Sequence, residues 1–266
     1  MHFTLGGAAG KSKAAHARSA SEPCHPIHTR LDAGIRALGA WSAAATRSGV
    51  DDGPSGLAAV EAVLAVLAEF LALPHAAAAL RDDERILDGF LALADAYGSF
   101  EPALLALKQS VSELRAGVRR RGDGATVAAS LRARKRAEKE LCRLAAAMRH
   151  ASRHALLAPA DGEVIGVVAE VAAATASASE AIFLGCAAMS LDVSTVVHTV
   201  SSNAWLASLR VVPAAKKAVV ALQETATVAA ALERLEERIG ELESGSEKVF
   251  RSLLQTRVSL LNIHTL

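Results

Sequence analysis

The chain has 266 residues, of which 52% are hydrophobic and only 3% aromatic, and its 29 basic residues nearly balance its 28 acidic ones. A large alanine share with few aromatic residues favours close-packed helices over a sheet, because strands are enriched in aromatic and β-branched side chains. The formal charge of +1 excludes a whole-protein field that would recruit nucleic acid or an acidic membrane, so any such contact must be local.

Residues 1–26 have the composition of a disordered tail, rich in glycine, serine and alanine. The same composition, with its basic residues, also resembles a transit peptide, so organelle import stays open as an alternative. Arg18 precedes Ser21 by three residues, which makes Ser21 a candidate phosphorylation site. We expect residues 27–266 to form a single helical-bundle domain.

Two amphipathic helices are expected after the tail. Thr29, with Asp32 three residues later, can cap the first helix, which should end at the glycines near residue 50. Pro54 opens the second helix, whose apolar residues alternate four- and three-residue spacings as far as Pro74. The alanine-rich residues 75–80 are then expected to form a turn.

Residues 86–118 carry the clearest pattern. Their apolar residues keep the four-three spacing without a slip, which predicts one helix of about 50 Å. Asp82 and Asp83 precede it, where carboxylates suit the positive end of the helix dipole. Pro102 predicts a local kink, although both halves should face one core. The predicted core stripe is Ile86, Phe90, Leu93, Tyr97, Phe100, Leu104, Leu107, Val111, Leu114 and Val118.

A basic helix is expected over residues 125–154. Glu138 and Glu140 follow Arg134 and Arg136 by four residues each, which predicts ion pairs on a solvated face. The arginines at 119–121 lie ten residues before this cluster, so a bipartite nuclear import signal stays open beside the structural interpretation.

Residues 164–209 are apolar and carry few charges. The central helix of a bundle explains this composition, because neighbouring helices would cover it on all sides. A membrane span is the alternative, but the charge-free part, 193–209, is shorter than the roughly 20 apolar residues that a span needs. Glu170 and Glu180 would lie about 15 Å apart along a helix, too far for a catalytic carboxylate pair.

The last helix, opened by Pro213, keeps a heptad stripe that we call the C-terminal ridge. The ridge must be buried against the long helix of the same chain or against a second chain, so the oligomeric state stays open. Its members are Leu232, Leu235, Ile239, Leu242, Val249, Leu253 and Leu260.

No catalytic, cofactor-binding or metal-binding constellation is recognisable in the sequence. Cys24, Cys142 and Cys186 are an odd number without metal-type spacing, which favours free thiols and a reducing compartment. No histidine and carboxylate pair can be assigned to activate any of them.

The ending RSLLQTRVSLLNI, residues 251–263, is similar to the C-terminal signature of a land-plant family grouped with the BYPASS proteins. This resemblance implies an all-helical, plant-specific protein without an established enzymatic activity, associated with root and shoot development, and it supplies no catalytic residues. Further matches follow the family's order at 18–21, Trp41, Gly56-Leu57, 71–74, 119–121 and 134–136.

Three function classes follow. We expect a non-enzymatic interaction or regulatory protein with an unidentified protein partner and no nucleic acid. A membrane-associated protein, anchored through residues 164–209, is the alternative, and an enzyme with dispersed catalytic groups is the third. A cytoplasmic location is expected, with the nucleus, the plastid and a membrane as alternatives.

Overall fold

The computed structural model describes residues 26–48, 52–119, 124–157, 162–209 and 214–265, with side chains at 26–47, 52–117, 128–155, 162–189 and 226–265. Within these ranges all regular secondary structure is helical, which confirms the all-α class expected from the composition. The helices are α1 (Pro26–Ser48), α2 (Gly53–Leu71), α3 (Pro74–Leu80), α4 (Glu84–Arg119), α5 (Gly124–Leu157), α6 (Glu163–Leu209) and α7 (Ala214–Thr265).

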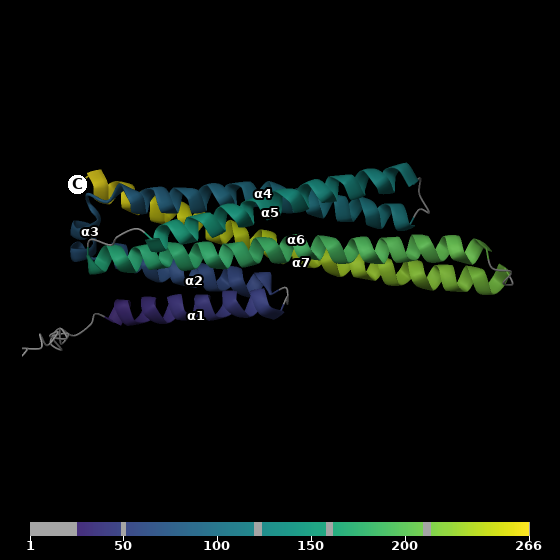
Figure 1. The fold of residues 1–266 in the computed structure, drawn as a ribbon, viewed down its shortest axis with the longest axis horizontal. Helices are drawn as coiled ribbons and strands as arrows, with labels where there is room; N and C mark the ends of the chain where they lie inside the picture. The colour runs from purple at the N-terminus through teal and green to yellow at the C-terminus, as the bar shows by residue number, and fades with distance from the viewer. Residues whose placement is uncertain (1–25, 49–51, 120–123, 158–161, 210–213, 266) are drawn as a thin grey trace, which may run out of the picture.

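The helices form an elongated bundle in which each long helix runs opposite to the one before it (Figure 1). The short α3 joins α2 to α4 at one end of the bundle. Besides its chain neighbour, α4 packs along α7, while α6 contacts every other helix. The far ends of α6 and α7 extend beyond the rest of the bundle (Figure 1). α6 is therefore the central element of the fold.

α4 is a continuous helix that includes Pro102. Every member of the predicted core stripe from Ile86 to Leu114 is buried, none more than 6% exposed. The side chain of Val118 lies outside the described residues. Burial of this stripe against α5, α6 and α7 explains why a helix of 36 residues, about 54 Å, is stable in this chain.

Asp83 begins α4. Its carboxylate accepts a hydrogen bond from the backbone N–H of Arg85 at 3.0 Å and another from the guanidinium of the same residue at 2.9 Å. These bonds to Arg85 hold the pKa of Asp83 below its usual value. Asp83 thus satisfies an amide at the helix N-terminus that has no partner within the helix.

Two predicted boundaries were wrong. α1 begins at Pro26, so Thr29 and Asp32 lie inside the helix and do not cap it. Residues expected to form a turn belong to α3, which begins at Pro74. In both places a proline at the helix start pre-sets the backbone angle, and the following alanines of α3 have the highest helix propensity.

α1 and α2 pack closely on each other at Gly56. A β-carbon at this position would lie 2.2 Å from the ring of Trp41, so only glycine lets the α1 indole pack across the start of α2. This contact gives a physical reason for the tryptophan and for the glycine, which are two separate points of the family resemblance.

The described side chains of α6, at residues 163–189, are mostly packed inside the bundle. Most apolar residues from Val168 to Met189 are buried, with Leu184 exposed, and the Ser179 hydroxyl donates to the Thr175 carbonyl at 2.7 Å. By length and composition, three helical segments among the described residues could cross a membrane: Gly53–Leu71, Glu84–Gly117 and Glu163–Met189. About half of each is buried inside the bundle, which accounts for their apolar character without lipid.

Candidate functional site

The C-terminal ridge lies against the rest of the same chain. All seven of its members are buried, and α7 packs mainly on α4 and α2. Ser246 and Thr256 occupy the same buried side, and the Thr256 hydroxyl donates to the Ser252 carbonyl at 3.0 Å. The C-terminal ridge is therefore buried within one chain and needs no second chain to cover it.

Ion pairs follow the line of contact between α4 and α7. Lys108 pairs with Glu243, and Arg115 lies 2.9 Å from Glu236 and 3.9 Å from Glu233. Because these groups are partly exposed, each pair contributes about 1 kcal/mol or less. Their value is in fixing the register of two antiparallel helices, while the apolar contact between the helices holds them together.

Near its C-terminal end, α7 also carries apolar residues on the side that faces solvent. Leu254 is 39% exposed, Val258 55% and Leu261 40%. Their spacing of four and three residues places them on one side of the helix, next to the buried Leu253 and Leu260. We call these three residues the α7 outer face.

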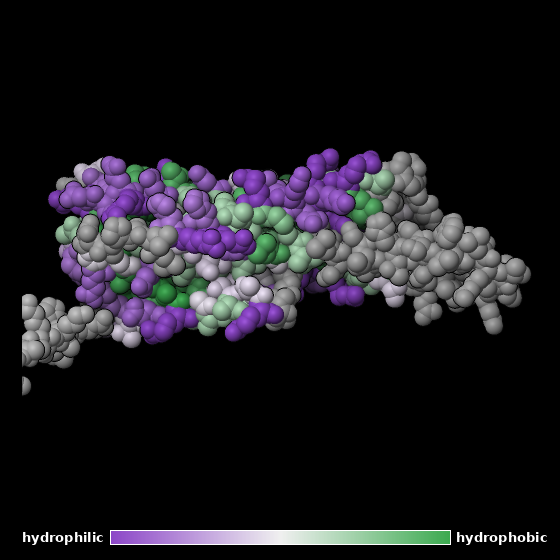
Figure 2. All heavy atoms as spheres, viewed as in Figure 1, coloured by the Kyte–Doolittle hydropathy of each residue, from purple (hydrophilic) through white to green (hydrophobic). Residues whose placement is uncertain are grey.

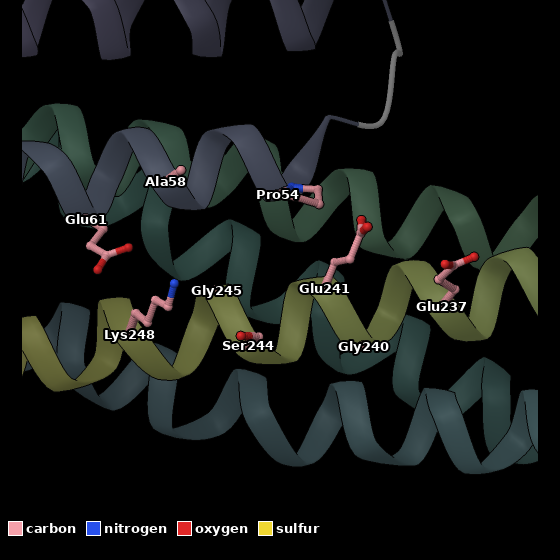
Figure 3. A pocket seen from close by; sticks show the side chains of 9 residues that line it. All are labelled: Pro54, Ala58, Glu61, Glu237, Gly240, Glu241, Ser244, Gly245 and Lys248. Atoms are coloured by element: carbon pink, nitrogen blue, oxygen red, sulfur yellow. The ribbon is translucent and has the colours of Figure 1, made fainter.

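A cavity of about 580 Å³ opens between α2 and α7. Figure 3 shows Glu61 of α2 and Lys248 of α7 pointing toward each other across it, with Glu237 and Glu241 farther along α7. A β-carbon at Gly245 would lie 3.0 Å from Leu57, so this glycine allows the two helices to approach beside the cavity. The heptad pattern of the last helix predicts its buried side and carries no signal for this close approach.

Tyr97, Phe100 and Phe183 form a buried aromatic cluster, in which Tyr97 carries the titratable group. Its hydroxyl lies 3.1 Å from the Ser179 hydroxyl, and its ring packs edge-on against Phe100 and Phe183. Burial raises the pKa of Tyr97 well above its usual value. The phenol therefore stays protonated and packed, which suits a structural role rather than a reactive one.

Arg134 does not lie on a solvated face, contrary to the prediction for this helix. Its side chain is 1% exposed and lies on the same side of α5 as the buried Ser130, Ala137 and Leu141. Burial lowers the pKa of Arg134, and the charge of Glu138 opposes this shift. The helical position decided the burial, although the surrounding residues form a charged run.

The predicted partner of Glu140 also differs. Both of its carboxylate oxygens accept hydrogen bonds from Arg143, at 2.6 and 3.0 Å, rather than from Arg136. A spacing of three residues serves this pair as well as the predicted spacing of four, because both place the side chains on one side of a helix.

Among the described side chains, no group of three or more histidine, cysteine, aspartate or glutamate residues could hold a metal ion. Cys142 is exposed and Cys186 is buried, and neither of the two forms a disulfide bond. Ser21, Cys24, the arginines at 120–121 and the side chain of His198 lie outside the described residues.

Comparison with known proteins gives one informative match. No curated protein and no solved structure matches the chain. A protein-family model described as Protein BPS1 matches residues 56–263, from the start of α2 to the last turn of α7. The matched region covers well over half of the chain and includes both the α4 core stripe and the α7 outer face. The chain therefore belongs to the plant-specific BPS1 family, in agreement with its resemblance to the BYPASS proteins.

Proposed function

We propose that this BPS1-family protein is a non-enzymatic interaction factor in root and shoot development that binds a helical protein partner through the α7 outer face. One observation carries the proposal. Leu254, Val258 and Leu261 remain 39–55% exposed although the helix that carries them is already packed on its other side. Apolar residues at this spacing are the anchors by which one helix recognises another.

The α7 outer face is preformed. Buried Leu253, Thr256 and Leu260 hold the opposite side of the same turns, so the exposed residues need no ordering when a partner arrives. Fully burying a leucine or valine side chain stabilises by about 1.5–3 kcal/mol, so covering three half-exposed ones contributes on the order of 3 kcal/mol. A partner would need polar contacts around this centre as well, and Arg251 and Arg257 are placed to offer them.

The non-enzymatic part of the proposal is supported by the environments of the titratable groups. BPS1 is not a known enzyme family. The described groups with shifted pKa values are explained by a helix cap at Asp83, by burial at Tyr97 and Arg134, and by surface ion pairs. None of the described cavities gathers several of them, which is the arrangement that would indicate catalysis.

A cytoplasmic location is part of the proposal. Cys142 and Cys186 form no disulfide bond, which suits a reducing compartment. Anchoring through residues 164–209 would require the bundle to open, because the described half of that segment is packed against other helices. A protein that resists alkaline extraction from membranes would favour that alternative.

The experiment compares two variants in plant tissue. The double variant Val258→Glu/Leu261→Glu replaces exposed residues. Its free energy of unfolding should therefore differ from that of the parent by no more than about 0.5 kcal/mol. Proximity labelling in roots and shoots should show loss of partners captured by the parent, and the variant should fail to restore development in a plant lacking the protein.

The matched control is Leu105→Glu, which changes a 60% exposed leucine on α4. It should keep both the partners and the developmental activity. The proposal is wrong if the double variant stays folded and keeps the same partners, or if the control loses them equally.

A further inference from the structure

α5 carries a larger net positive charge than the whole chain does. This helix holds eight basic and two acidic residues, a net charge of +6, while the whole chain has +1 and the remainder therefore has −5. The basic residues are Arg132, Arg134, Lys135, Arg136, Lys139, Arg143, Arg149 and Arg153.

Most of these cations lie on the outer side of α5. Arg143 and Arg149 are engaged, with Glu140 and Glu180 respectively, at 2.6 Å each. Five others form no ion pair with any side chain that the structure describes, and all five are exposed. We call these five the α5 basic face: Arg132, Lys135, Arg136, Lys139 and Arg153.

We propose that the α5 basic face docks the protein on an anionic lipid surface. The row extends over 22 residues, from Arg132 to Arg153, about 32 Å along a helix. It follows the edge of the bundle formed by α4 and α5, where hydrophilic residues gather in Figure 2. α5 lines none of the three described cavities, so these cations do not converge on a small anion. Diverging cations along a straight rod suit an extended anionic plane.

Nucleic acid fits the same face less well. α5 contains no phenylalanine, tyrosine or tryptophan, the large rings on which unpaired bases stack best. α4 and α6 flank it along its length, so the helix cannot enter the major groove of a duplex as a recognition helix does.

A protein partner also fits less well. Protein interfaces have an apolar centre surrounded by polar residues. The described large apolar residues that are exposed lie on α4, α6 and α7, and none lies on α5. Between its cations the face exposes small residues, Cys142, Ala146 and Ala147, which allow the helix to lie close to a plane of lipid headgroups.

The first test measures binding of the full chain to phosphatidylcholine vesicles with and without one third phosphatidylserine. Each cation near an anionic surface contributes about 1 kcal/mol, roughly fivefold in affinity. Arg136→Gln/Lys139→Gln should therefore weaken binding to the anionic vesicles about twenty-five-fold. Raising the salt concentration should weaken binding by the parent as well.

The matched control is Arg36→Gln/Arg234→Gln. It removes the same charge from exposed positions on α1 and α7, two helices that do not contact α5. It should bind anionic vesicles within about twofold of the parent. The α7 outer-face variant should also bind vesicles as the parent does, which separates a failure of this proposal from a failure of the proposed function.

The second test places a reporter on the face itself. An environment-sensitive fluorophore on the exposed Cys142, in a Cys24→Ser background, should shift to shorter wavelength with anionic vesicles and stay unchanged with neutral ones. Three results would overturn the proposal: no binding to anionic vesicles at low salt, equal losses in the α5 variant and the control, or tighter binding to duplex DNA or RNA than to the vesicles.

Discussion

α4 and the C-terminal end of α7 pack on each other, yet their apolar residues are distributed differently. On α4 the apolar stripe faces the bundle, and Leu105, at 60% exposure, is the exception among its described side chains. On α7 the turns that bury Leu253 and Leu260 also expose Leu254, Val258 and Leu261. Burial within the fold explains the apolar sequence of α4. It explains only one side of α7, and the other side is where we expect the protein's partner.

The largest effect should come from charging the α4 stripe. Leu107 is fully buried in mid-helix, so Leu107→Asp would place a carboxylate among apolar neighbours. We expect a loss of about 4 kcal/mol or more in the free energy of unfolding, measured by chemical denaturation. Leu105→Asp, two residues away, should change it by less than about 0.5 kcal/mol. Similar losses in both variants would show that α4 has no distinct inner side.

A smaller effect should distinguish the two glycines of α7. Nothing lies within 4 Å of a β-carbon placed on Gly240, so Gly240→Ala should stabilise the protein by about 1 kcal/mol through helix propensity. At Gly245 the added methyl would meet Leu57 at 3.0 Å, and Gly245→Ala should gain less or lose stability. Thermal unfolding of both variants tests this order, and equal gains would contradict the close approach of α7 to α2.

The smallest effect concerns the start of α4. The pKa of Asp83 is lowered in the folded protein, so its carboxylate stabilises the fold above the ordinary aspartate pKa, and this contribution is lost as the pH falls through the folded value. Asp83→Asn should cost about 1 kcal/mol or less at neutral pH and nearly nothing in acid. Denaturation at several pH values gives the comparison, and a pH-independent cost would mean that the charge of Asp83 is unimportant.

Periodicity predicted the helices and their inner sides, because burial repeats with the turn of the helix. The same rule could have found Arg134, which stands seven residues before the buried Leu141. The charged run around it pointed to solvent instead, and helical position proved the stronger guide. The α3 helix was missed because a short alanine-rich segment has no apolar stripe to reveal it.

Other features depend on which helices meet. The close approach of Gly56 to Trp41, and of Gly245 to Leu57, is fixed by contacts between different helices. Leu254, Val258 and Leu261 are as apolar as their buried neighbours, so the sequence alone could not show which of the two sides of α7 the fold covers. Four of the five cations of the α5 basic face were visible as a run in the sequence, but their exposure on one side, and the addition of Arg153, needed the structure.

The most direct measurement compares Leu253→Asp with Leu254→Asp, because these adjacent residues are 0% and 39% exposed. Unfolding free energy and partner capture would be measured for both. The account predicts that Leu253→Asp loses several kcal/mol of stability, whereas Leu254→Asp keeps its stability and loses its partner. Equal destabilisation, or a stable Leu254→Asp variant that still captures every partner, would contradict a separation of fold and function between the two sides of α7.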